Sequence, residues 1–187
     1  MKKVIPTLSS MLVVIGAYAQ GTINFAARVV GVYDAPVYVG AVGGTNPKAE
    51  GSRYLVQLYG GSTETDLAAI GTALPFRTGA AAGYWTATAL AIPNVPPGAT
   101  AMVQVRAWAA AFGATYEAAL AAFGPAAASA IFTVKTGGDG SPPTLPGMLS
   151  GLSSFAIPND RCGDCPEPSI LTLGALGSLV LLLRRLK

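Results

Sequence analysis

The sequence predicts a mostly β protein, an antiparallel β-sandwich with one short inserted helix and one further helix at each end of the chain. Between residues 20 and 158, short segments alternate apolar and polar side chains with a period of two, as half-buried strands do. Clusters of Gly, Pro, Asn and Asp separate these segments and predict turns. Residues 1–19 and 169–186 differ from the middle because each contains an apolar run next to basic residues.

The composition fits one folded domain between these ends. Apolar residues make up 51% of the 187-residue chain, which is enough for a core. β-branched and aromatic residues are spread through the middle, and this disfavours disorder. The 23 glycines and 14 prolines supply many turns. Many short strands joined by turns are typical of immunoglobulin-like and jelly-roll-like sandwiches.

The expected strands follow one another between the turn clusters. In the first, Ile23, Phe25 and Ala27 share one face. In a later one, apolar residues alternate with Gln104 and Arg106. The expected strands after the first cover residues 54–59, 84–92, 102–108 and 131–135, and the turn clusters cover residues 40–47, 93–98 and 137–143.

A short helix is expected at residues 115–123, between two strands. Thr115 can cap its start, and the Gly-Pro pair that follows can end it. Glu117 on this helix and Arg106 on the preceding strand are expected to form an ion pair, with Arg106 braced by Trp108. A structural role for this pair is favoured over a catalytic one.

The N-terminus has the three parts of a secretory signal peptide. A basic start and a short apolar run precede Ala17 and Ala19, which form an A-x-A cleavage site. Residues 1–19 are therefore expected to be removed by signal peptidase during Sec export, so that the mature chain begins at Gln20. A short core helix is the alternative.

The C-terminus predicts a marginal membrane span. Its uncharged run of 14 residues, 170–183, would span about 21 Å as a helix, short of the roughly 30 Å hydrocarbon core. Arg side chains can snorkel and the bilayer can thin, so a transmembrane helix is expected at about residues 169–186. A basic membrane stop follows the run and is expected to stay in the cytoplasm. Its residues are Arg184, Arg185 and Lys187.

Residues 166–187 resemble the PEP-CTERM sorting signal. Pro166, Glu167 and Pro168 form the triplet that gives this signal its name, and an apolar segment with small residues and an Arg cluster follow in order. The resemblance implies recognition by an exosortase, a multi-pass membrane enzyme that cleaves at the motif, in a Gram-negative host that exports polysaccharide. An ordinary single-span anchor is the alternative, although such anchors have longer apolar runs.

Two further stretches are similar to PEP-CTERM proteins of Verrucomicrobia-like bacteria. The first is Gly-Thr-Ile-Asn-Phe at residues 21–25. The second is Val-Gln-Val-Arg-Ala-Trp at residues 103–108, followed by Thr-Tyr-Glu-Ala-Ala at residues 115–119. This resemblance covers most of the domain, but it implies no molecular activity.

The predicted organisation has four parts. These are a signal peptide (1–19), a β-sandwich domain (20–158), a linker with two cysteines (159–165) and the sorting signal (166–187). Prolines are frequent at residues 139–168. This stretch is therefore expected to be extended and to hold the domain away from the membrane.

The two cysteines, Cys162 and Cys165, are separated by two residues and lie in the predicted linker. Such a pair can form a disulfide, a redox pair or half a zinc site. A zinc site needs two more ligands, but the chain has no other cysteine and no histidine. A redox pair favours a helix N-terminus, whereas Pro166 follows here. A local disulfide is the simplest interpretation in an oxidising compartment, and a bond to the exosortase or another chain is the alternative.

Few acidic residues are candidates for metal binding. Asp34 and Asp139 lie in turn-like sequences and can each bind calcium together with backbone carbonyls. Calcium loops concentrate several oxygens, however, so turn roles are favoured for both. Glu64 and Asp66 are expected in a solvated loop. No metal site and no cofactor is predicted.

Charge and composition disfavour nucleic-acid binding and hydrolysis. The net charge of +3 comes from five basic residues in the end segments, and the remaining seven basic and nine acidic residues give −2. A nucleic-acid partner is therefore not expected. The absence of histidine removes Ser-His and Cys-His nucleophile pairs. No catalytic residue is predicted.

The predicted function is that of a non-enzymatic structural protein. The chain is expected to be exported, held transiently in the inner membrane with its C-terminus in the cytoplasm, and then placed at the cell surface or in the extracellular matrix. The alternative is a module that binds carbohydrate, such as exopolysaccharide, on a platform of Tyr84, Trp85 and Trp108. Aromatic residues on strands usually pack in the core, so burial of these rings would favour the structural role. A hydrolase would need two carboxylates facing each other across a cleft.

Overall fold

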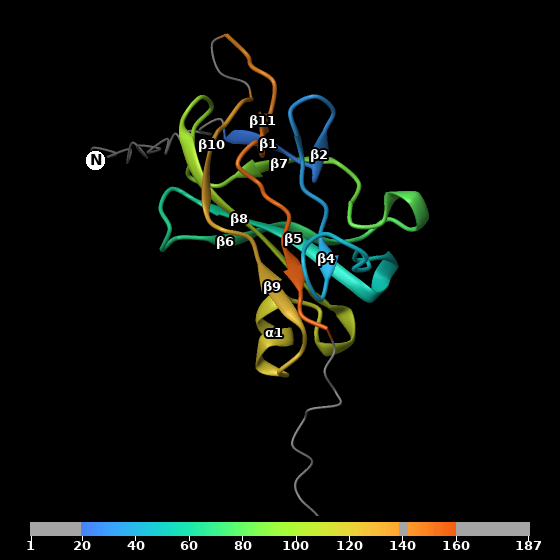
Figure 1. Cartoon of the computed structure of the whole chain (residues 1–187). Coiled ribbons are helices and arrows are strands. Elements are labelled where there is room, and N and C mark those ends of the chain that lie inside the picture. Colours follow the sequence, from blue (N-terminus) through green and yellow to red (C-terminus); the bar gives the residue numbers. More distant parts are fainter. Residues whose placement is uncertain (1–19, 139–141, 160–187) are drawn as a thin grey trace, which may run out of the picture.

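The computed structural model describes residues 20–138 and 142–159, and this part of the chain is mostly β, with several sheets and one α-helix (Figure 1). The twelve strands within it are β1 (Gly21–Phe25), β2 (Arg28–Val29), β3 (Tyr33–Asp34), β4 (Tyr38–Val39), β5 (Tyr54–Gly61), β6 (Ala68–Pro75), β7 (Thr88–Ile92), β8 (Thr100–Ala109), β9 (Ala126–Ala128), β10 (Phe132–Lys135), β11 (Gly147–Met148) and β12 (Ala156–Ile157). The helix is α1 (Tyr116–Ala121), and the short 3₁₀ helices are η1 (Gly51–Arg53), η2 (Gly79–Ala81) and η3 (Ala110–Phe112).

The larger sheet is antiparallel and has the order β10-β8-β5-β6, with β9 also paired to β8. Its centre is the pair of long strands β5 and β8. They run side by side from the pairing of Tyr54 with Ala109 to the pairing of Gly61 with Met102. Because successive side chains of a strand point to opposite faces of the sheet, β5 and β8 each present one set of side chains to the core and another to the outer face.

The smaller sheet has the order β11-β1-β7. Strand β1 is antiparallel to β7 and parallel to β11. A two-residue pair of β4 and β12 is also parallel, and β2 and β3 form a short antiparallel hairpin. The pairing is therefore antiparallel except at β11 and β12, which add short parallel edges from the last part of the domain.

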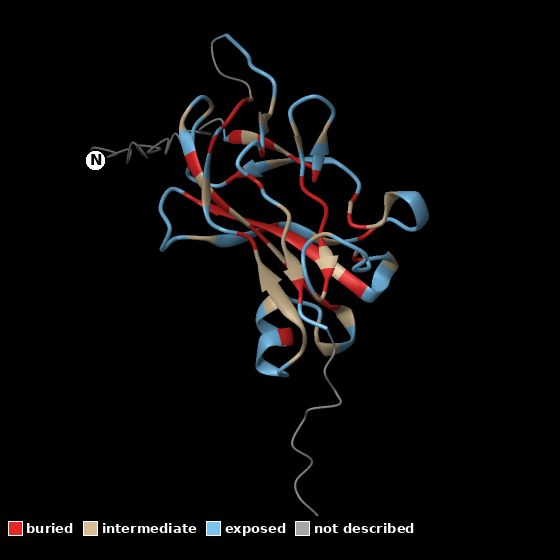
Figure 2. Ribbon diagram, in the orientation of Figure 1, coloured by how far each residue is buried: buried red, intermediate tan, exposed pale blue. Residues whose placement is uncertain are grey.

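The two sheets share one apolar core. Its buried residues run along the long strands in the middle of the molecule (Figure 2). The expected alternation is confirmed in β1, where Ile23 and Phe25 are fully buried, and in β8, where Val103, Val105 and Ala107 are fully buried. Other members come from further strands and include Val56, Leu58, Ile92 and Val134.

The segment at residues 142–159 corrects a prediction. Its prolines led to the expectation of an extended spacer, although the predicted domain (20–158) included most of it. Its apolar side chains Leu149, Leu152 and Ile157 are buried in the domain, so this part of the chain does not act as a spacer. Proline favours extended backbone, and an extended segment with buried side chains can pair along a sheet edge as well as run free. The proline content therefore identified the backbone conformation but not its packing.

The other expected elements match in part. The expectations of strands at residues 54–59, 102–108 and 131–135 are confirmed by β5, β8 and β10. The strand expected at residues 84–92 is shorter, because only β7 is regular and Trp85 forms an isolated bridge with Phe76. Strand β6 was not expected, because its alanines, glycine and threonine show little contrast between faces.

No helix in residues 20–138 and 142–159 has the length and apolarity to cross a bilayer. The two terminal helices of the prediction, in the signal peptide and at about residues 169–186, lie outside the described residues.

Candidate functional site

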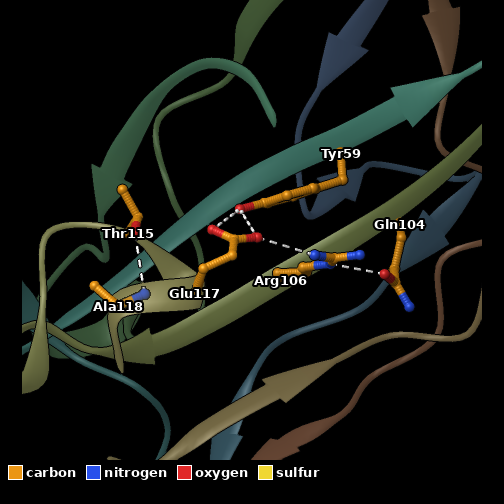
Figure 3. A network of polar contacts seen from close by, with 6 residues as sticks. All are labelled: Tyr59, Gln104, Arg106, Thr115, Glu117 and Ala118. Atoms are coloured by element: carbon orange, nitrogen blue, oxygen red, sulfur yellow. Dashed lines mark hydrogen bonds and ion pairs between the residues drawn. The ribbon is translucent and has the colours of Figure 1, made fainter. Parts of the chain in front are cut away.

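The best-connected polar cluster in the described residues lies on the outer face of the larger sheet, beneath α1 (Figure 3). We call it the helix–sheet cluster, and its members are Tyr59 of β5, Gln104 and Arg106 of β8, and Glu117 of α1. The β5–β8 register sets Tyr59 opposite Gln104, so Arg106 is its diagonal neighbour. Neighbouring elements β8 and α1 therefore form one site together with β5, which lies about fifty residues earlier in the chain.

Glu117 is the centre of the cluster. The Tyr59 hydroxyl donates to its carboxylate and lies 2.9 Å from each oxygen. Nη1 of Arg106 donates to Oε1 at 3.2 Å. Arg106 also donates from Nε to the Gln104 side chain at 2.8 Å, and Gln104 donates to the backbone oxygen of Ser129 at 3.0 Å. The cluster thus ties the helix to the sheet through directional contacts.

Aromatic rings hold the Arg106 guanidinium in place. Its central carbon lies 3.9 Å from the ring centroid of Tyr59 and 5.0 Å from that of Tyr116. A guanidinium over an aromatic face is attracted by the ring quadrupole. The predicted Arg106–Glu117 ion pair is confirmed, but the predicted brace is wrong, because the two tyrosines contact Arg106 where Trp108 was expected.

Trp108 lies under the helix as an apolar support. Its side chain is fully buried, and its ring packs edge-on against Tyr116 with centroids 6.3 Å apart. The indole N–H donates to the backbone oxygen of Gly113 at 2.9 Å, which satisfies its only polar atom. Ala119 of α1 is also fully buried. A small second core therefore lies outside the sheet.

The helix starts where the sequence predicted. The Thr115 hydroxyl accepts a hydrogen bond from the backbone N–H of Ala118 at 3.2 Å, as an N-cap does. This fixes the first turn, and Glu117 in that turn then faces the sheet (Figure 3). Local capping chemistry and the tertiary cluster therefore support the same helix position.

The chemistry of the cluster is that of a fixed hydrogen-bond donor and acceptor set. Burial raises the pKa of Tyr59 to about 12, and the hydrogen bond to Glu117 and its charge act in the same direction, partly opposed by Arg106. Tyr59 is therefore a protonated donor at neutral pH. The single hydroxyl proton of Tyr59 lies within reach of both oxygens of Glu117, and Arg106 donates to one of them. The arrangement supports stabilisation of the helix.

The aromatic residues weighed as an alternative sugar platform do not form one, and the two tryptophans pack inside the domain, as was favoured. Trp85 and Trp108 are 3% and 0% exposed, so neither presents a ring face to a ligand. Trp85 packs on Phe25 and Phe76 in the main core, with centroids 4.8 and 6.0 Å apart. Tyr84 is half-buried and donates from its hydroxyl to Asp34 at 2.8 Å.

The acidic candidates have structural surroundings. Asp34 lies in β3, where a turn was expected, and pairs with Arg28 at 3.7 Å. Glu64 and Asp66 lie in the exposed loop between β5 and β6, as predicted, and the Thr63 hydroxyl donates to Asp66 at 2.8 Å. Within the described ranges, no group of three or more Cys, Asp or Glu side chains is close enough to hold a metal ion.

Gln20 is exposed and is the first described residue. The other residues expected to direct processing and sorting lie outside the described residues. These are Ala17 and Ala19 at the signal peptidase site, Cys162 and Cys165, the triplet Pro166, Glu167 and Pro168, and the membrane stop Arg184, Arg185 and Lys187. Asp139 also falls there.

Tyr59 is the member of the cluster that the sequence did not single out. Its strand was predicted, but its role depends on the pairing register of β5 with β8. A tyrosine followed by two glycines at the end of a strand gives no sign of which carboxylate its hydroxyl will meet. Comparisons with protein-family models, with curated proteins and with solved structures found no match for this chain.

Proposed function

We propose that this chain is an exported protein sorted by an exosortase, and that its folded domain has a non-enzymatic structural role at the cell surface or in the extracellular matrix. The observation that carries the proposal is the ordered tail: a Pro-Glu-Pro triplet, a short uncharged run and a basic end. A run of 14 residues is short for a permanent anchor. A temporary stop that is then cut accounts for both the triplet and the short run.

The proposed route uses both ends of the chain. Signal peptidase removes residues 1–19 after Sec export, and the segment at about residues 169–186 holds the chain in the inner membrane. The basic end stays in the cytoplasm, in keeping with the positive-inside rule. The exosortase then cuts at the triplet and releases the domain to its final location, where Cys162 and Cys165 form a local disulfide in the oxidising compartment.

The shared core supports an antiparallel β-sandwich as the finer description of the domain. Side chains from β1 and β7 of one sheet and from β5 and β8 of the other belong to the same buried cluster. Two sheets that bury facing sides against each other form such a sandwich, of immunoglobulin-like or jelly-roll-like kind.

The contacts inside the domain support a structural role. Both tryptophans are buried, and the best-connected polar side chains hold α1 on the sheet. A domain whose aromatic and charged groups serve its own fold suits a scaffold or matrix component. A glycan array probed with the purified full chain tests this part, and specific binding to a glycan would replace the structural role with carbohydrate binding.

The sorting proposal is tested by removing the triplet. We expect the wild-type chain with a C-terminal epitope to lose that epitope in cells that contain an exosortase. The variant Pro166→Ala, Glu167→Ala, Pro168→Ala should keep it and stay in the inner-membrane fraction. Immunoblots of fractionated cells measure both.

A matched control carries Pro142→Ala and Pro143→Ala, the same kind of change outside the tail. It should be processed like the wild type. Loss of the epitope in an isogenic strain without the exosortase, or equal processing of the triplet variant, would overturn the proposal.

A further inference from the structure

A pocket of about 360 Å³ lies beside the β2–β3 hairpin and has no part in the proposed sorting. This volume is near the lower end for small-molecule sites, which range over about 300–1,000 Å³. The pocket is lined by Ala26, Ala27, Arg28, Val30, Arg77, Ala80, Ala81, Tyr84, Trp85 and Ala87. The lining therefore contains two arginines and no carboxylate, in a chain with only 11% charged residues.

The two arginines come from separate parts of the chain that the core holds together. Arg28 lies in β2, directly after the buried pair Ala26 and Ala27. Arg77 follows the buried Phe76, and its backbone N–H donates to the Tyr84 oxygen at 2.7 Å. The backbones that carry both guanidinium groups are thus fixed by the fold.

The side chain of Arg28 is partly engaged. Its Nε atom lies 3.7 Å from Asp34 Oδ2, and Tyr84 donates to the other oxygen of Asp34. This contact leaves the two terminal nitrogens of the guanidinium able to donate to a ligand. Arg77 is exposed, and its side chain has no hydrogen bond or ion pair with the described residues. The two arginines therefore bring more positive charge to the pocket than the one carboxylate in contact with them, that of Asp34, neutralises.

The neighbouring charges do not cancel this excess. The Asp34 carboxylate is already shared between Arg28 and Tyr84. Glu50 accepts a hydrogen bond from the backbone N–H of Gly79, next to the pocket rim. Nζ of Lys48 lies 5.3 Å from the Tyr84 ring centroid and adds a further positive charge nearby.

We propose that this pocket binds a small organic carboxylate with a body about the size of one ring. The guanidinium groups of Arg28 and Arg77 would take the carboxylate, because the planar guanidinium fork matches its two oxygens. The alanine methyl groups and Val30 would contact the body of the ligand. The two sources of such a ligand are an acidic sugar and a hydrocarbon acid, which share the carboxylate.

Isothermal titration calorimetry on the full chain in a non-ionic detergent tests the proposal. The probes are glucuronate and cyclohexanecarboxylate, which have the same ring size and charge, with glucose and inorganic phosphate as comparisons. We expect one or both acids to bind at least about tenfold more tightly than glucose or phosphate. Preference for glucuronate identifies an acidic sugar as the ligand and would then also replace the structural role with carbohydrate binding. Preference for cyclohexanecarboxylate identifies a hydrocarbon acid and leaves the structural role in place.

Two variants and one control locate the binding. Arg77→Gln should weaken acid binding by roughly tenfold without loss of fold, because this side chain is exposed. Arg28→Gln should do the same, and circular dichroism checks that the hairpin change leaves the domain folded. Lys135→Gln removes one positive charge at an exposed side chain of β10, which does not line the pocket, and should leave binding unchanged.

Three results would overturn the proposal. The first is that neither acid binds. The second is that glucose or phosphate binds as tightly as the acids. Equal binding of glucose would show that the carboxylate is not recognised, and equal binding of phosphate would show that the ring is not recognised. The third is that Lys135→Gln weakens binding as much as Arg77→Gln, which would mean attraction by overall charge.

Discussion

The two faces of β8 bury side chains by different means. On the inner face, Val103, Val105 and Ala107 are fully buried among other apolar groups. On the outer face, Arg106 and Trp108 lie under α1, and each has a named partner: Glu117 for the guanidinium and the Gly113 oxygen for the indole. Apolar side chains on the inner face are stabilised by burial whatever their exact orientation, because the hydrophobic effect is not directional. The hydrogen bonds on the outer face depend on the distances and angles between donor and acceptor.

This difference teaches where specificity lies in the domain. Apolar burial is proportional to area and tolerates exchange between similar side chains. The outer face adds hydrogen bonds that a shifted register would break, because Tyr59 reaches Glu117 only in the observed β5–β8 pairing. We infer that the inner face supplies most of the stability and the outer face fixes the position of the helix.

Truncation of Trp108 should have the largest effect. Trp108→Ala removes a fully buried ring, its contact with Tyr116 and its hydrogen bond to Gly113, so we expect a loss of about 3–5 kcal/mol. Denaturant unfolding measures it. Trp108→Phe keeps most of the apolar area and should lose clearly less. An equal loss in the two variants would show that the hydrogen bond outweighs the packing.

Val105→Ala on the inner face should cost about 2 kcal/mol, because it deletes two buried methyl groups and leaves a small cavity. Val30→Ala, at a side chain that is 82% exposed, is the control and should lie within about 0.5 kcal/mol of the wild type. The helix should remain docked in Val105→Ala, as measured by hydrogen exchange of α1. Selective loss of protection in α1 would contradict the separation of the two faces.

Glu117→Ala should cost about 1 kcal/mol, because it removes the acceptor of Tyr59 and the ion-pair partner of Arg106. The effect is limited because the Glu117 side chain is 59% exposed and water can replace it. Unlike Val105→Ala, this change should lower hydrogen-exchange protection in α1 more than in β8. Glu64→Ala, in the exposed β5–β6 loop, is the matched control and should change neither protection nor stability.

The titration of the Tyr59 hydroxyl should report on the contacts of the outer face of β8 alone. The folded chain keeps the Tyr59 proton up to a pKa of about 12, whereas an unfolded tyrosine loses it near pH 10. The contribution of Tyr59 to stability is therefore complete below about pH 10 and is lost as the pH rises through about 12. Glu117→Gln should lower the Tyr59 pKa, since the carboxylate helps to raise it. The ultraviolet absorbance of tyrosinate measures this, with Tyr59→Phe to assign the step; an unchanged Tyr59 pKa in Glu117→Gln would contradict the cluster.

Local patterns predicted much of the fold and part of the cluster. Period-two alternation identified β1 and β8, and Thr115 marked the start of α1. The pairing of Arg106 with Glu117 could be predicted, because strand, short loop and helix follow one another closely in the sequence. Strand β6 could not be predicted, because a run of small residues shows almost no difference in polarity between its two faces. The contact of Arg106 with the Tyr59 ring could not be predicted, since Tyr59 belongs to a strand about fifty residues earlier.

The sequence by itself determined that the middle of the chain is mostly β, where the central strands β5 and β8 lie, and that one capped helix follows β8. These features depend on side chains close in sequence, so their periodicity and capping residues are visible in it. Only the tertiary structure decided how residues 142–159 pack on the domain, which groups the two buried tryptophans contact, and that Arg28 and Arg77 share a pocket. These features depend on which distant segments meet, and that is set by strand register and by burial in the common core.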